Sequence, residues 1–197
     1  MSLIDRCRER CRHSEEEEGF TLIELLVVLL IIGILLAIAI PTFLSVTKGA
    51  NGTAAESNLQ TALTGGDTYF TDNNQSYSGI MSPGFGVSTL TQINTGLTYQ
   101  VSTVATNNTH NIIYTVGTNS ESIGFMAFAP GQNRCYGVVD VKATGSAPTG
   151  VTLPSGATTT WYGYVATSSG QCTGADLTKI SSTAGTAGAW QDTGFPK

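Results

Sequence analysis

Residues Phe20–Val46 read FTLIELLVVLLIIGILLAIAIPTFLSV and contain one charged residue, Glu24, and one proline, Pro41. A helix crosses a bilayer with about 20 apolar residues, so this stretch predicts a membrane-spanning helix. A cleaved secretory signal would have a shorter apolar region of about 7–15 residues, followed by a small-residue cleavage site. Here the notable junction, Gly19-Phe20, lies before the apolar region. Because a charge in hydrocarbon costs about 2.5–3.5 kcal/mol at the bilayer centre, Glu24 calls for a partner.

Charge is unevenly distributed along the chain. Residues 1–19 hold four arginines and six acidic residues, whereas charged residues make up only 12% of the whole sequence. The arginines favour a cytoplasmic N-terminus and an exported body, since acidic residues contribute little to orientation. The body is mildly acidic and poor in Lys and Arg, which argues against a general nucleic-acid binder.

The segment Gly19-Phe20-Thr21-Leu22-Ile23-Glu24, followed by the apolar stretch, resembles the class III signal of type IV prepilins. The family signature is Gly, Phe and Thr-Leu-Ile-Glu before about fifteen apolar residues. Gly33 and Pro41 also match common pilin positions, where they imply helix flexibility. The resemblance covers residues 19 to about 46 only. It departs from the pattern at Glu15–Glu18, where many leaders carry Lys or Arg.

The resemblance implies a processing route. A membrane-embedded prepilin peptidase is expected to cut between Gly19 and Phe20 and to methylate the new amino group of Phe20. Residues 1–19 would then be a cytoplasmic leader, and Cys7 and Cys11 would be lost with it. The precursor would stay in the inner membrane as a single-pass protein until the pilus assembly machinery extracts it.

Glu24 lies four residues after Phe20, about one helical turn along the same face. In a filament core its carboxylate can neutralise the Phe20 amine, and an unpaired buried charge would be expensive. Such a pair would fix the axial register of the subunits. Whether the partner amine belongs to the same subunit or to the next one stays open.

The helix is expected to continue beyond the membrane, from Phe20 to about Asn73. Residues 20–47 would form the apolar filament-core part and residues 48–73 an amphipathic continuation. Pro41 would kink or loosen the helix, because it lacks a backbone N–H. Four further glycines should weaken it by up to about 1 kcal/mol each. The apolar face of the continuation contains Ala55, Leu59, Ala62, Leu63, Gly66 and Phe70.

After a loop at residues 74–96, residues 97–197 are expected to form an antiparallel β head. One face of its sheet should cover the helix and the other should meet solvent or a neighbouring subunit. This is an α+β fold with the type IV pilin architecture, a long helix on a four- to five-stranded sheet. Strands are predicted at Leu97–Ala105, Asn111–Gly117, Ser122–Ala129, Cys135–Val141 and Thr160–Thr167. Hairpin turns are predicted at Asn107-Asn108, Asn119-Ser120 and Pro130–Asn133.

Cys135 and Cys172 are widely spaced in an exported domain, which suggests one disulfide. The alternative is a pair of free buried thiols. A bond would close a loop of about 37 residues and could stabilise the head by about 3–4 kcal/mol. Pilins often carry such a C-terminal disulfide loop.

Catalytic signals are weak. His110 is the only histidine after the leader, and we interpret it as a surface residue. The sequence has no CxxC, no clustered metal ligands and no phosphate-binding glycine loop. Asp140 and Asp176 look like isolated acids. We therefore expect no catalytic residue, no metal and no cofactor, and a protein that is not an enzyme.

These features favour a structural pilin that polymerises with copies of itself into a helical surface filament. Such a filament could serve adhesion, motility, DNA uptake or aggregation, with any nucleic-acid binding a property of the filament. One alternative is a pseudopilin of a type II secretion system. Another is a minor pilin acting as a tip adhesin or DNA receptor. A membrane-anchored binding module that never polymerises would leave the Gly19-Phe20 junction and Glu24 without a purpose.

Overall fold

The computed structural model describes residues 19–80, 89–143, 147–154 and 159–197. The predicted leader, with Cys7 and Cys11, lies outside the described residues except for Gly19. The chain divides into two compact units, Met1–Leu44 and Ser45–Lys197. We call the second one the head unit.

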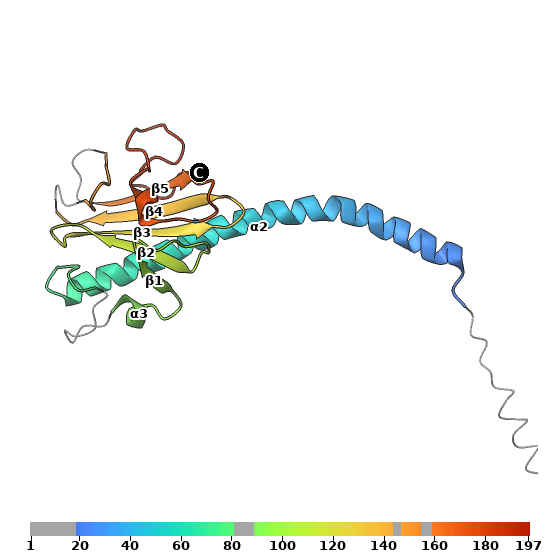
Figure 1. Cartoon of the computed structure of the whole chain (residues 1–197), viewed down its shortest axis with the longest axis horizontal. Helices are drawn as coiled ribbons and strands as arrows, with labels where there is room; N and C mark the ends of the chain where they lie inside the picture. The colour runs from blue at the N-terminus through green and yellow to red at the C-terminus, as the bar shows by residue number, and fades with distance from the viewer. Residues whose placement is uncertain (1–18, 81–88, 144–146, 155–158) are drawn as a thin grey trace, which may run out of the picture. The chain divides into compact units, whose positions relative to one another are not determined.

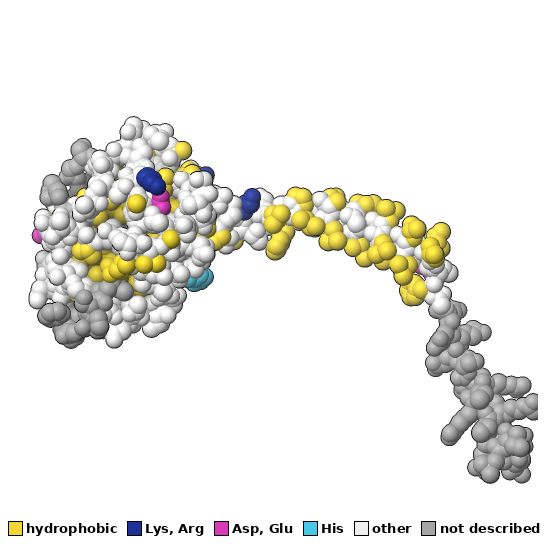
Figure 2. Space-filling model, in the orientation of Figure 1, with side chains coloured by type: hydrophobic (Ala, Val, Ile, Leu, Met, Phe, Trp, Pro, Cys, Tyr) yellow, Lys and Arg dark blue, Asp and Glu magenta, His cyan; other side chains and the backbone are white. Residues whose placement is uncertain are grey.

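A single long helix, α2, runs from Leu22 to Asp72. This confirms the predicted helix, with both ends within two residues of the expected positions, and it continues through Pro41 and Gly52. In the first unit its apolar side chains are exposed on all sides, and Figure 2 shows hydrophobic side chains gathered along it. The face of the head unit turned to the viewer in Figure 2 is mostly neither hydrophobic nor charged.

The head unit contains one five-stranded sheet in the order β1-β2-β3-β4-β5 (Figure 1). Strands β2 to β5 pair antiparallel with their neighbours in sequence, as predicted. The turn at Asn119-Ser120 closes the β2–β3 hairpin, with Gly117 N donating to Ser122 O. The strands are β1 (Thr98–Val101), β2 (Asn111–Val116), β3 (Ser122–Ala129), β4 (Arg134–Val141) and β5 (Thr160–Ala166).

The expectation of a wholly antiparallel sheet is wrong at its first strand, because β1 pairs with β2 in parallel. Residues 102–110 therefore cross back along the sheet, and Asn107-Asn108 is not a hairpin turn. Two contacts from the C-terminal part of the chain hold this crossover. Gly174 N donates to Ser102 O, and Thr106 pairs with Cys172 in an isolated bridge. The strand predicted to reach Ala105 consequently ends at Val101.

The C-terminal half of α2 packs on one face of the sheet, as expected (Figure 1). Its buried residues include Ala55, Leu59 and Ala62. Gly65 and Gly66 belong to the same buried face. A Cβ at Gly66 would lie 3.3 Å from the ring of Phe125, and one at Gly65 would overlap the side chain of Asn94. Sequence reasoning placed Gly66 on the apolar face of the helix but treated Gly65 only as a helix weakener. Both glycines let the helix approach its neighbours closely.

The other face of the sheet does not meet solvent, contrary to the sequence expectation. All eight residues of β3 are buried, as are seven of the eight in β4. A second apolar cluster covers this face with Leu177, Ile180 and Trp190 from the C-terminal part of the chain. Leu177 and Ile180 pack closely on the sheet because Gly137 has no side chain. A Cβ at Gly137 would lie 2.7 Å from Leu177 Cδ1 and 2.9 Å from Ile180 Cδ1.

Two short helices were not predicted. α3 (Leu90–Ile93) lies within residues 74–96, which the sequence predicted to be a loop. α4 (Gly174–Leu177) follows Cys172. Each begins with a threonine whose backbone N–H is bound by a side chain three residues later. Gln92 Oε1 accepts from Thr89 N at 2.9 Å, and Asp176 Oδ2 accepts from Thr173 N at 2.8 Å.

Candidate functional site

The start of α2 is organised by a reciprocal pair, Thr21 and Glu24. Glu24 Oε2 accepts from Thr21 N at 2.9 Å and from Thr21 Oγ1 at 2.7 Å, while Glu24 N donates to Thr21 Oγ1 at 3.3 Å. This capping box satisfies backbone donors that the first helical turn would otherwise leave unpaired. The Thr-x-x-Glu spacing is the sequence signal for it, and sequence reasoning had assigned Glu24 to subunit pairing alone.

Gly19 and Phe20 precede this box and are exposed; the Phe20 side chain is 81% exposed. The peptide bond that joins them is therefore accessible in the first unit. In the uncut chain the Phe20 nitrogen is an amide, so it carries no charge for Glu24 to neutralise. Glu24 Oε1 has no hydrogen-bond partner within the described residues and remains available as an acceptor.

Leucine, isoleucine and valine side chains surround the rest of the helix in the first unit. Their exposed fractions range from 44% at Val27 to 82% at Leu22. Within the described residues, α2 is the one helix long and apolar enough to cross a membrane. An isolated helix with this surface in water would expose far more apolar area than soluble monomers tolerate. The segment must be covered by lipid or by other protein.

The two predicted points of flexibility lie inside the uninterrupted helix. A Cβ at Gly33 would meet no atom within 4 Å. Next to Pro41, the Thr42 hydroxyl donates to Ala39 O at 2.8 Å and Ile38 O at 3.3 Å. These bonds add contacts to the turn where proline removes one. That Gly33 and Pro41 loosen the helix stays a prediction.

The disulfide predicted between Cys135 and Cys172 is present, with the two Cα atoms 5.7 Å apart. Both cysteines are 0% exposed and belong to the second apolar cluster. Cys135 lies in β4, while Cys172 pairs through its backbone with Thr106 of the β1–β2 crossover. The bond therefore joins the sheet to the segment that holds the crossover in place.

Asp140 and Asp176 are not isolated, contrary to the sequence interpretation. Asp140, 4% exposed, accepts from Tyr77 Oη at 2.6 Å and Thr160 Oγ1 at 3.1 Å, and pairs with Lys142 Nζ at 2.9 Å. Asp176 pairs with Lys179 Nζ at 2.6 Å. Burial alone would raise the pKa of Asp176, but hydrogen bonds from Lys179 and Thr173 outweigh it and hold the pKa below 3.8.

His110 is exposed, and its Nδ1 lies 3.2 Å from Thr109 Oγ1. This contact to a neighbouring hydroxyl does not give the imidazole an acidic orienting partner of the kind used in nucleophilic catalysis. In the part of the chain that the structure describes, no three His, Cys, Asp or Glu side chains gather as metal ligands.

Comparison with known proteins finds matches to parts of the chain. Residues 17–40 match the family described as prokaryotic N-terminal methylation motif. A 64-residue stretch is 39% identical to the type IV major pilin protein PilA of Myxococcus xanthus, covering 32% of this chain and 29% of the relative. A 57-residue stretch is 47% identical to the type IV wide pilus major component PilA4 of Thermus thermophilus, covering 29% of this chain and 44% of the relative. The matches thus span less than half of either relative. No solved structure matches the chain.

Proposed function

We propose that this chain, whose N-terminal part is that of a type IV pilin, is a structural subunit of a surface pilus rather than an enzyme. The N-terminal motif, the similarity to two major pilins and the long helix on a sheet support this proposal. The observation that carries it is the exposure of nearly every apolar side chain between Leu22 and Val46.

Processing supplies the first step. A prepilin peptidase cuts the exposed peptide bond between Gly19 and Phe20 and methylates the Phe20 nitrogen. The cut leaves the apolar helix intact, so the chain is held in the membrane by this helix until assembly extracts it. The leader leaves with Cys7 and Cys11, so the disulfide between Cys135 and Cys172 is the one that the mature subunit keeps.

Assembly exchanges lipid for protein around the helix. Helices of neighbouring copies cover the apolar side chains that the membrane covered before. Cleavage gives Phe20 a positively charged amine, and Glu24 Oε1 is the free acceptor that can bind it. Because a buried charge is tolerable only when paired, the pair selects one axial register. The capping bonds from Thr21 hold the Glu24 carboxylate in place for this contact.

The test uses Glu24→Gln, which keeps the size and the capping acceptor but removes the charge. Glu121→Gln, a charge change in the head unit, is the matched control. Sheared surface filaments and the membrane-bound precursor pool are quantified for both variants. We expect Glu24→Gln to be cleaved normally and to lose at least about tenfold in filament yield, because each added subunit would bury the Phe20 amine without its charged partner. A normal filament yield from this variant would contradict the register argument.

A further inference from the structure

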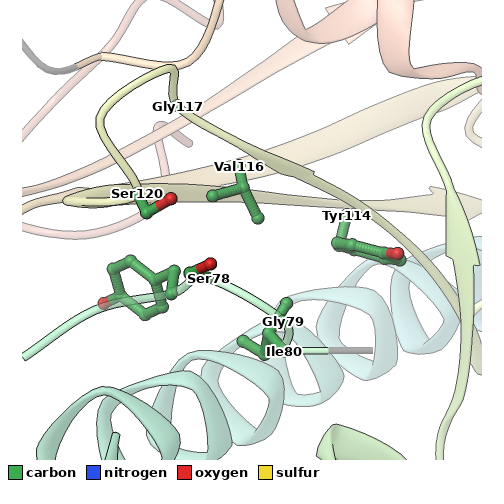
Figure 3. Close-up of a pocket in the computed structure, with 8 residues that line it drawn as sticks. Ser78, Gly79, Ile80, Tyr114, Val116, Gly117 and Ser120 are labelled. Carbon is green, nitrogen blue, oxygen red and sulfur yellow. The ribbon is translucent and has the colours of Figure 1, made fainter. Parts of the chain in front are cut away.

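We infer that a pocket at one end of the head unit binds one neutral hexose unit. The pocket has a volume of about 330 Å³ and lies between the segment that follows α2 and the end of β2 (Figure 3). Tyr114, Val116 and Ser120 line one side in Figure 3, and Ser78 and Ile80 lie opposite them. Its size is at the lower end of the range of ligand pockets, which suits a single small ring.

The lining carries no charge. None of the eight lining residues is an acid, a lysine, an arginine or a histidine. The two tyrosines stay neutral at physiological pH, since burial raises the pKa of Tyr114 and of Tyr77 above 10.0. A charged ligand would lose hydration here without gaining a counter-ion, so the pocket selects a neutral one.

Three hydroxyl groups are free to bind a ligand. Ser78 Oγ, Ser120 Oγ and Tyr114 Oη have no hydrogen-bond partner within the described residues. The neighbouring backbone is mostly occupied. Ser78 O accepts from Tyr69 Oη, Ser120 O accepts from Tyr77 N, and Gly117 O accepts from Ser120 N. A hydroxyl both donates and accepts, so each of these groups can bind a hydroxyl of a sugar.

The remaining lining is apolar and aromatic. Ile80 is buried and Val116 half-buried, and Tyr114 presents a half-buried ring. A hexose has an apolar C–H face as well as its hydroxyl edge, and an aromatic ring with a polar tip is suited to such an amphipathic ligand. The shape is also held in place. Tyr77 Oη is bound to Asp140, and Tyr77 N is bound to the β2–β3 turn at Ser120.

This inference does not depend on filament assembly, so its test uses the unassembled chain. The full-length ¹⁵N-labelled protein is kept in micelles of a detergent without a sugar headgroup, which would otherwise compete. Methyl glucoside, galactoside and mannoside are titrated while the amide resonances of Gly79, Gly117 and Ser120 are followed. For a ligand of this size we expect at least one to bind with a dissociation constant of about 1 mM.

Variants locate the binding. Ser78→Ala combined with Tyr114→Phe removes two of the three hydroxyls and should weaken binding about tenfold or more. Ser57→Ala combined with Tyr162→Phe makes the same chemical changes outside the pocket and should leave the dissociation constant unchanged. A methyl glucuronide should bind at least about fivefold more weakly than the neutral glycoside, because its carboxylate has no partner.

The inference is overturned if none of the three hexosides shifts the pocket resonances. It is also overturned if the pocket variant binds as well as its control, or if the glucuronide binds as well as the neutral sugar. A retained amide spectrum in the pocket variant shows that any loss comes from the missing hydroxyls rather than from unfolding.

Discussion

Tyr77 Oη donates a 2.6 Å hydrogen bond to Asp140 Oδ2 inside the head unit, where Tyr77 is fully buried. Lys142 extends this contact, since its ammonium lies 2.9 Å from Asp140 and 2.7 Å from Asp67 of α2. Thr160 of β5 donates to the other Asp140 oxygen. The network therefore links the helix, the segment that follows it and two strands of the sheet.

Replacing Tyr77 by Phe should destabilise the head unit by about 1.5–3 kcal/mol, because a hydrogen bond to a charged group is lost inside the protein. The fluorescence of Trp161 and Trp190, both buried in the head unit, reports its unfolding by denaturant. Tyr162→Phe is the matched control, since the half-buried Tyr162 hydroxyl has no bond within the described residues. Equal stability of the two variants would contradict the role of the network.

The same bond makes the head unit sensitive to alkaline pH. Burial, together with the charge of Asp140, raises the pKa of Tyr77 above its ordinary value of 10.0. A group whose pKa is higher in the folded state contributes full stability below the unfolded pKa and loses it as the pH rises further. Stability should fall above about pH 10, and the fall should be shallower in Tyr77→Phe. Identical slopes in both proteins would exclude Tyr77 as a source of this dependence.

Two glycines of α2 should respond in opposite ways to alanine. At Gly49 a Cβ would meet no atom within 4 Å, so Gly49→Ala should stabilise the helix by about 0.5–1 kcal/mol. At Gly65 the methyl group would displace Asn94, whose side chain donates to Thr61 O and to Tyr99 Oη at 3.0 Å each. Gly65→Ala should therefore destabilise by about 1–2 kcal/mol. The two variants are compared with the unchanged protein by thermal unfolding. Stabilisation by Gly65→Ala as well as by Gly49→Ala would refute the close approach of Gly65 to Asn94.

The disulfide should be slow to reduce and costly to lose. Cys135 and Cys172 are both 0% exposed, so a reductant reaches the bond only when the head unit opens. Thiol labelling after timed exposure to dithiothreitol measures this rate, and reduction should accelerate sharply in moderate denaturant. Because the cysteines are 37 residues apart, the reduced protein should be about 3–4 kcal/mol less stable. Rapid reduction of the folded protein would contradict the observed burial.

The features that the sequence predicted are those set by local patterns. Three such features depend only on residues that are neighbours in the sequence. They are the apolar stretch from Phe20, the alternation of turn residues and β-rich runs, and the amphipathic continuation of the helix. The parallel strand β1 depends instead on contacts of residues 102–110 with Cys172 and Gly174, which lie far away in the sequence. Such contacts leave no local signal.

Two features that the sequence analysis did not predict are nevertheless visible in the sequence. The β3 segment SIGFMAFA carries almost no polar residue, which is typical of a strand buried on both faces. The spacing of Thr21 and Glu24 is that of a capping box, and it gives Glu24 a role in the isolated subunit. The acid is therefore held by its own helix before any neighbouring subunit arrives.

We have proposed that the chain is cut before Phe20 and assembled into a surface filament. The most direct test is intact mass and N-terminal sequencing of protein sheared from the cell surface. We expect a chain that starts at N-methylated Phe20, with the mass of one added methyl group and two hydrogens fewer for the Cys135–Cys172 bond. An uncut chain found only in the membrane fraction would contradict it.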